Sequence, residues 1–206
     1  MTKNLFDRYF LDGWRPYAWI ACAAFLLYFK SLFFGYTFLD DNALILNNID
    51  FLKNIGNVGA AFTQKVFAKS YLPYYRPVLT ISFMFDAQVG GSALLFYHLM
   101  NIAYHALASC LVLVLLMRLG YGRSLSFLCA MVFVVHPVLS QGVAWIPGRN
   151  DTLLAVFILL SFISFLGVLR TGSAGYYITH LAFLLLAIFT KETALVLLVM
   201  CILYLH

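Results

Sequence analysis

Charge is scarce in this 206-residue sequence: only 10% of the residues are charged, and only eight residues are Asp or Glu. Soluble globular domains carry about 25% charged residues and about 50% apolar ones, whereas 64% of this chain is hydrophobic. Proline is also scarce, with five residues against 20 Phe and 13 Tyr, which excludes the polar composition of a disordered chain. The composition indicates an all-α integral membrane protein with several spans.

Cysteine is limited to four residues, which all lie in apolar runs without CxxC spacing: Cys22, Cys110, Cys129 and Cys201. This pattern argues against a disulfide framework or a zinc site and favours small buried hydrophobes. The 13 Lys and Arg form no basic patch interleaved with exposed aromatics. Lipid headgroups explain the basic excess better than nucleic acid does, so we expect membrane lipid as a partner and no nucleic acid.

Long apolar segments follow a polar N-terminus at 1–16, which we expect to be cytoplasmic. A bilayer is crossed by about 20 apolar residues in a helix. The first segment has no small-residue cleavage site after it, so it resembles an uncleaved signal anchor. We expect residues 17–206 to form one transmembrane module of about six spans, at 17–36, 94–117, 125–146, 152–169, 176–189 and 194–205.

The most polar part of the chain is the long first loop at 37–93. Within it, 43–51 and 58–67 space their apolar residues like short amphipathic helices that lie on a membrane surface. The apolar run at 78–85 is too short to span a bilayer and is expected to be interfacial or re-entrant. The chain stops at His206 inside an apolar run, from which we expect a piece of a longer protein.

Orientation follows from Lys and Arg in the short loops. The N-terminal segment and the loops at 118–123 and 170 together hold six of them, and the opposite short loops hold two, Arg149 and Lys191. We therefore predict a cytoplasmic N-terminus and an external first loop, in a bacterial inner membrane rather than the endoplasmic reticulum.

Six of the eight acids then fall on the external side, at membrane boundaries, where ionisable groups are costly and often functional. Four cationic or titratable side chains accompany them. We predict an external polar site at membrane level, assembled from Asp40, Asp41, Asp50, Asp86, Asp151 and Glu192 with Arg76, His136, Arg149 and Lys191.

Asp40 and Asp41 follow directly after the first span. Two adjacent carboxylates at a low-dielectric boundary suit a general base or a cation ligand. The alternative is an acidic start for a helix that continues from Asn42, a position that Asp favours. No metal-ligand cluster is indicated, although a divalent cation could bind at these acids.

Two further patterns have a functional and a structural interpretation. Arg76, flanked by Tyr74 and Tyr75, could hold a phosphate through its guanidinium, or the three residues could form an interfacial aromatic belt. His98 and His105 lie on one face of the second span with Asn101. Hydrogen bonding between helices is the expected role of His105, whereas His98 is near enough to the external end to reach a site.

The stretch 136–151 contains several helix breakers, and irregular backbone at membrane depth is tolerated only where it lines a cavity or is packed in protein. It therefore indicates either a functional cavity, with His136, Arg149 and Asp151 at its edge, or packed irregular backbone. Lys191 and Glu192 could neutralise each other, or Lys191 could face a phosphate.

Together these motifs resemble one family. They are Asp-Asp after the first span, Tyr-Arg-Pro at 75–77, HxxN…H in the second span, His-Pro-x-x-x-Gln-x-Val-Ala-Trp-Ile-x-Gly-Arg-x-Asp at 136–151, and Lys-Glu at 191–192. The pattern is similar to GT-C class glycosyltransferases that use polyprenyl-phosphate sugars. It most resembles the TMTC-type protein O-mannosyltransferases and their bacterial tetratricopeptide-bearing relatives, over roughly 37–195.

The resemblance implies a multi-span enzyme with an external site, a polyprenyl-phosphate-sugar donor such as a mannosyl lipid, and a protein or glycan acceptor. It further implies inverting transfer with Asp40 or Asp41 as base, and a site lined by Arg76, His98, His136, Arg149, Asp151, Lys191 and Glu192. A non-catalytic membrane assembly subunit and a cation-coupled transporter fragment are the alternatives.

Overall fold

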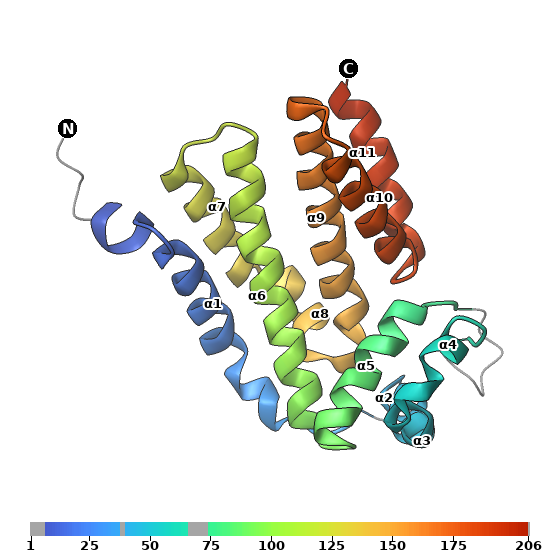
Figure 1. The fold of residues 1–206 in the computed structure, drawn as a ribbon. Helices are drawn as coiled ribbons and strands as arrows, with labels where there is room; N and C mark the ends of the chain where they lie inside the picture. The colour runs from blue at the N-terminus through green and yellow to red at the C-terminus, as the bar shows by residue number, and fades with distance from the viewer. Residues whose placement is uncertain (1–6, 38–39, 66–73, 206) are drawn as a thin grey trace.

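The computed structural model describes residues 7–37, 40–65 and 74–205 (Figure 1). Every regular element within these ranges is helical. This confirms the expected all-α fold, and its long apolar helices fit an integral membrane protein.

Three helices are long and apolar enough to cross a membrane. The first runs over Arg15–Phe33, where α1 (Arg15–Tyr28) continues as a 3-10 turn. The second is α6 (Leu94–Arg118). The third is Ile146–Thr171, a 3-10 turn that leads into α9 (Arg149–Thr171).

The other three expected spans are less regular. The segment at 125–146 is bent by 50° between α7 (Arg123–Val135) and Pro137–Ala144, which ends in α8 (Ser140–Ala144). The bend lies at His136-Pro137, because proline removes a backbone donor and disfavours helix at the residue before it. The apolar helices α10 (Ala174–Ile188) and α11 (Val196–Leu205) are shorter. Within the described residues, three helices, or four elements with the bent pair, are long and apolar enough to span a membrane; we expected about six spans.

The long helices are arranged around α6, which packs against α1, α7 and α9, while α9 packs against α10. Both ends of the described chain lie toward one end of this bundle, and α2–α5 lie at the other (Figure 1). The loops expected to be cytoplasmic meet at the first end, because the Arg123 guanidinium donates to the Gly13 carbonyl and Arg170 to the Arg118 carbonyl.

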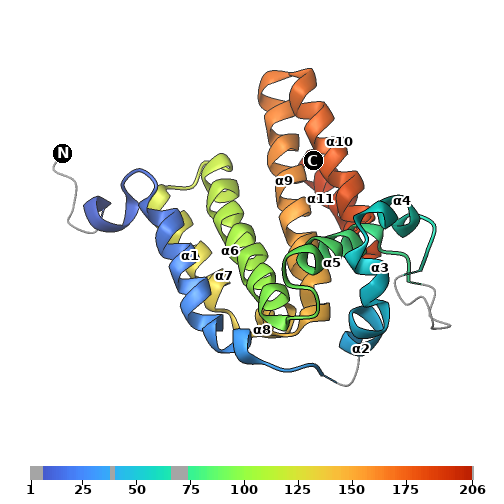
Figure 2. The ribbon, with the colours of Figure 1, turned by 60° about the horizontal axis from the view of Figure 1, so that its bottom comes forward.

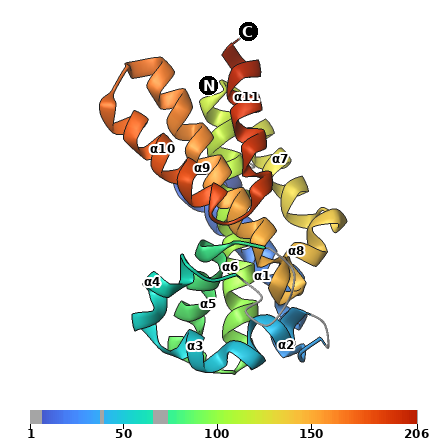
Figure 3. The ribbon, with the colours of Figure 1, turned by 90° about the vertical axis from the view of Figure 1, so that its right-hand side faces the viewer.

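The first loop folds into short helices at the opposite end of the bundle (Figures 2 and 3). They are α2 (Asp40–Leu44), α3 (Ile49–Lys53), α4 (Val58–Ala61) and α5 (Pro77–Gly90). The run expected at 43–51 is therefore divided between α2 and α3, and the part of 58–67 beyond residue 65 lies outside the described residues. The apolar run at 78–85 is the centre of a 14-residue helix, α5, which starts at a proline and is followed by Gly91 at a φ of 58°.

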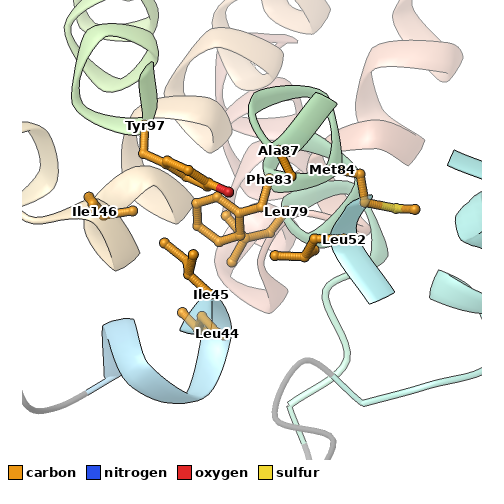
Figure 4. Close-up of a cluster of buried hydrophobic side chains, with 9 residues drawn as sticks. All are labelled: Leu44, Ile45, Leu52, Leu79, Phe83, Met84, Ala87, Tyr97 and Ile146. Atoms are coloured by element: carbon orange, nitrogen blue, oxygen red, sulfur yellow. The ribbon is translucent and has the colours of Figure 1, made fainter. Parts of the chain in front are cut away.

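A buried hydrophobic cluster fixes this loop on the bundle (Figure 4). Its members come from α2, α3, α5, α6 and the turn before α9: Leu44, Ile45, Leu52, Leu79, Phe83, Met84, Ala87, Tyr97 and Ile146. Each large side chain buried in this way contributes about 1.5–3 kcal/mol. The cluster therefore holds the C-terminal end of α2, and with it the acids of its first turn, against α5 and α6.

Candidate functional site

An open groove of about 320 Å³ lies beside Asp41, at the end of the bundle where α2–α5 lie. The end of the first span, α2, α6 and the irregular segment around α8 all contribute to it. Its lining residues are Phe34, Thr37, Asp41, His98, Ser140, Gln141, Ala144, Trp145 and Ile146. Three of the sequence motifs, the Asp pair, the polar face of the second span and the stretch 136–151, therefore meet at one place.

Asp41 is held by one of its two carboxylate oxygens. Its Oδ2 accepts hydrogen bonds from the backbone N–H and the hydroxyl of Thr37, both at 2.8 Å. The Thr37 hydroxyl in turn accepts from the indole N–H of Trp145 at 3.1 Å. The other oxygen, Oδ1, is buried and has no hydrogen-bond partner among the described residues.

Asp40 lies at the start of α2, is partly exposed and does not line the groove. The two acids therefore occupy different environments, although they are adjacent in the sequence. Both lie in the first turn of α2, inside the helix and not as an N-cap before Asn42.

His98 is the second ionisable group in the groove and is only 2% exposed. Neither of its ring nitrogens makes a hydrogen bond of normal geometry with the described residues, although the backbone of Phe34 lies close to the ring. Asp41 and His98 thus bring three buried polar atoms without partners to the same groove. Native proteins leave few such atoms, and each calls for an explanation.

A second pocket, also of about 320 Å³, lies on the other side of α8, and Gln141 lines both. Its walls come from α6, α7, α8 and α9. Six of its lining residues are not polar: Ala108, Phe133, Val138, Leu139, Gly142 and Ala155. The four polar ones come from α6, α8 and α9: His105, Gln141, Asp151 and Thr152. His105 also bonds to the Val134 carbonyl through Nε2 at 3.0 Å, which confirms the expected hydrogen bond between helices.

Arg149 lies elsewhere and is fully buried, with 0% exposure. Its Nη2 pairs with Asp86 at 2.5 Å and donates to the Tyr97 carbonyl at 2.7 Å. Its Nε donates to Asn101 Oδ1 at 2.7 Å, and its guanidinium carbon lies 4.5 Å from the centre of the Phe83 ring. Arg149 therefore joins α9 to α5 and α6 and lines neither the groove nor the pocket described above.

Two further ion pairs meet at the turn between α10 and α11. Lys191 pairs with Asp151 at the start of α9, and Glu192 accepts from Arg76 through two hydrogen bonds of 2.8 and 3.3 Å. The hydrogen bond from the Arg76 guanidinium holds the pKa of the Glu192 carboxyl below its ordinary value. The ion-pair partners of Lys191 and Glu192 are therefore Asp151 in α9 and Arg76 directly before α5, and not each other.

The predicted single polar site is thus divided by the fold. Asp41 and His98 share the groove, Asp86 and Arg149 form a buried pair, and the turn at 191–192 carries two ion pairs. His136 is exposed, and its Nδ1 accepts from the Val138 N–H at 3.3 Å. Within the described residues, no group of three or more His, Cys, Asp or Glu side chains could hold a metal ion.

Sequence reasoning missed the role of Thr37 and of the Asn101 amide. Thr37 is only four residues before Asp41, and a hydroxyl at that spacing from a boundary acid is the signal that could have identified it. Asn101 was singled out for its position on one helix face. Its contacts with backbone carbonyls near α8 depend on tertiary packing.

No family model matches the sequence, and no solved structure is significantly similar to it. Relatives with known names do match. The protein O-mannosyl-transferase TMTC1 of Mus musculus is 32% identical, over 91% of this chain and 21% of its own length. Tmtc1 of Drosophila melanogaster is 31% identical, over 86% of this chain and 21% of its own length. TMTC3 of Mus musculus is 32% identical, over 67% of this chain and 15% of its own length.

These relatives come from animals and give no support to the expected bacterial inner membrane. The matched region covers most of the chain. The chain is homologous to the TMTC-type protein O-mannosyltransferases, as its motifs predicted, and it spans about a fifth of the length of these relatives.

Proposed function

We propose that this chain carries the base and part of the donor site of a membrane glycosyltransferase that acts at the external, periplasmic or luminal, face. The reaction transfers a hexose from a polyprenyl-phosphate donor to a hydroxyl of a protein or glycan acceptor. Mannose is the favoured sugar because the relatives are named protein O-mannosyl-transferases. Asp41 is the base, in preference to Asp40.

The observation that carries this proposal is the set of unpartnered polar atoms in the groove. Asp41 Oδ1 is buried without a hydrogen bond to the described residues, and neither buried ring nitrogen of His98 makes one of normal geometry with them. Leaving each such atom unsatisfied costs about 1–3 kcal/mol. A ligand rich in hydroxyl groups supplies the missing partners, and a sugar together with its acceptor hydroxyl is such a ligand.

The chemistry needs one carboxylate. The acceptor oxygen forms a bond to the anomeric carbon of the sugar, and its proton passes to Asp41 Oδ1. The bond between that carbon and the phosphate oxygen breaks, and the polyprenyl phosphate leaves with the electron pair. Since phosphate is a good leaving group, no strong general acid is required, and a single displacement inverts the anomeric centre with one base.

The lipid part of the donor has a suitable place beside this groove. The pocket across α8 has largely apolar walls, and Gln141 connects it to the groove of Asp41. A prenyl chain in that pocket would carry its phosphate near Asp151, whose partner is Lys191. We therefore propose Lys191 as the cation that stabilises the phosphate charge, with Arg76, which pairs with the neighbouring Glu192, as a second candidate.

The test compares Asp41→Asn with Asp40→Asn in the full-length protein in native membranes. The substrates are a polyprenyl-phosphate mannose with a labelled sugar and a protein acceptor. A positioned general base contributes about 10²–10⁴-fold to the rate, so Asp41→Asn should lose at least about 100-fold of transfer. Asp40→Asn should retain transfer close to that of the wild type, and both variants should insert normally.

Full transfer by Asp41→Asn would reject Asp41 as base. Purified protein that binds no polyprenyl phosphate would indicate a non-catalytic membrane subunit. Cation flux in liposomes, without sugar transfer, would indicate a transporter.

A further inference from the structure

A directed chain of hydrogen bonds leads to Asp41. The Trp145 indole N–H donates to the Thr37 hydroxyl at 3.1 Å, and that hydroxyl donates to Asp41 Oδ2 at 2.8 Å. An indole N–H can only donate, and a hydroxyl has one hydrogen to give. With Trp145 as donor, the Thr37 hydrogen is free to point at Asp41. The chain therefore fixes Oδ2 as the held oxygen and leaves Oδ1 free to receive a proton.

The backbone that carries Trp145 is itself held by α6. The Nδ2 amide of Asn101 lies 3.1 Å from the Trp145 carbonyl, 3.3 Å from that of Val143 and 3.4 Å from that of Ile146. Val143 belongs to α8 and Ile146 to the 3-10 turn before α9, and Trp145 is the single residue between these two elements. A single buried amide thus fixes the place from which the indole reaches Thr37.

Asn101 is in turn oriented by the buried ion pair. Arg149 Nε donates to Asn101 Oδ1 at 2.7 Å, and Arg149 Nη2 pairs with Asp86 at 2.5 Å. With its oxygen accepting from Arg149, the Asn101 amide must present its N–H groups to the carbonyls around Trp145. Asp86, Asn101 and Arg149 are all 3% exposed or less. Buried ionic groups contribute little net stability, and fixing a unique arrangement is one of their attested roles.

We infer that Thr37 and Trp145 are positioning residues for Asp41, and that the Arg149–Asp86 pair anchors them through Asn101. The inference rests on the proposed function, because it concerns the base of that reaction. Asp86, Asn101 and Arg149 lie outside the groove and do not need to touch the reacting atoms. The same holds for the Thr37 hydroxyl and the Trp145 indole within it. Their effect is to hold the Asp41 carboxylate in one orientation.

The first test replaces Thr37 by valine and by serine in the full-length protein, with the transfer assay described above. Thr37→Val keeps the shape and the backbone N–H bond but removes the hydroxyl. A misplacement of about 1 Å at a reacting group can cost about 100-fold, so we expect kcat to fall by about 10- to 100-fold. The KM for the polyprenyl-phosphate sugar and the thermal unfolding temperature should change little. Thr37→Ser restores the hydroxyl and should restore kcat.

The second test replaces Trp145 by phenylalanine, which keeps an aromatic ring and removes the N–H donor. We expect a smaller fall in kcat than with Thr37→Val. Because both side chains act through the same chain of bonds, the double variant should be no slower than Thr37→Val alone. If the loss of kcat in the double variant equals the product of the two single losses, Trp145 acts independently of Thr37, and the proposed chain of hydrogen bonds is rejected.

The outcomes separate this inference from the proposed function. Wild-type kcat in Thr37→Val, together with an inactive Asp41→Asn, would overturn the positioning role and leave Asp41 as base. A lower unfolding temperature in Thr37→Val that serine also fails to restore would show a merely structural role and would equally overturn it. Full transfer by Asp41→Asn would remove the base and the positioning role together.

Discussion

Two buried carboxylates, Asp41 and Asp86, have opposite surroundings. Asp86 is 3% exposed, faces the Arg149 guanidinium at 2.5 Å and does not line the groove of Asp41. Asp41 is just as buried, at 1% exposure, but its Oδ1 has neither a hydrogen bond nor an ion pair among the described residues, whereas Asp86 Oδ2 has the Arg149 cation; Asp41 also lines an open groove. A buried acid matched by a cation holds helices together, whereas one with a free oxygen beside a groove is able to react with a ligand.

The two regions are connected through the segment that joins α8 to α9. Arg149 begins α9, and Trp145, four residues earlier, contacts the residue that holds Asp41. The comparison therefore predicts that changes near Asp86 affect stability first, whereas changes near Asp41 affect transfer first. The following variants test this division, from the largest expected effect on stability to the smallest.

Removal of the Arg149 side chain should have the largest effect on stability. Arg149→Ala leaves Asp86 buried without its cation, and breaking a buried pair in this way costs about 3–5 kcal/mol. Arg149→Lys keeps the positive charge and should lose less stability than Arg149→Ala. Thermal unfolding of the purified protein in one detergent measures both. Equal unfolding temperatures for Arg149→Ala and the wild type would show that the pair does not anchor the fold.

Gly148→Ala should have an intermediate effect, because the chain approaches itself closely at this residue. A Cβ at Gly148 would lie 2.4 Å from the Gln141 carbonyl oxygen and 2.9 Å from the Gly142 Cα, which are both backbone atoms. Overpacking of this kind costs about 1–3 kcal/mol. Gly142→Ala is the matched control, since the nearest atom to its Cβ is at 3.7 Å. A Gly148→Ala variant as stable as Gly142→Ala would contradict the close packing of this segment.

The ion pair between Arg76 and Glu192 should have the smallest effect, because the Glu192 side chain is 60% exposed. Exposed pairs contribute about 0–1 kcal/mol. Arg76 lowers the pKa of Glu192 in the folded protein, so this stabilisation is present above the ordinary pKa of 4.5 and is lost as the pH falls below it. Unfolding temperatures measured between pH 7 and pH 3 should show a small decrease that Glu192→Gln lacks. Identical pH profiles would mean that the pair does not form.

Much of the fold followed from the sequence because apolar length and breakers are local properties. The six apolar segments are helical, and the bend at His136-Pro137 lies where the proline predicted an interruption. The motifs singled out Asp41, His98 and the stretch 136–151 one by one, and the fold brings Asp41 and His98 to one groove with Trp145. The predicted site also included Lys191 and Glu192, which lie apart from this groove.

The sequence could not predict which charged residues form ion pairs with one another. Arg149 was a candidate for a phosphate, but the fold gives it Asp86, 63 residues earlier in the chain, and Lys191 pairs with Asp151 rather than with its neighbour. Charge pairing depends on which helix faces come into contact, and one sequence does not show that. The sequence likewise did not distinguish Asp40 from Asp41 as the base. In the fold, only Asp41 lines the groove, and Thr37 donates to its carboxylate.

The most direct test measures transfer and thermal unfolding together for Asp41→Asn and Asp86→Asn in the full-length protein. The account predicts that Asp41→Asn loses at least about 100-fold of transfer and unfolds close to the wild-type temperature. Asp86→Asn should unfold at a clearly lower temperature, because Arg149 is left buried without its anion. Transfer retained by Asp41→Asn, or an unfolding temperature lowered by Asp41→Asn and unchanged by Asp86→Asn, would contradict the division between a reactive and an anchoring carboxylate.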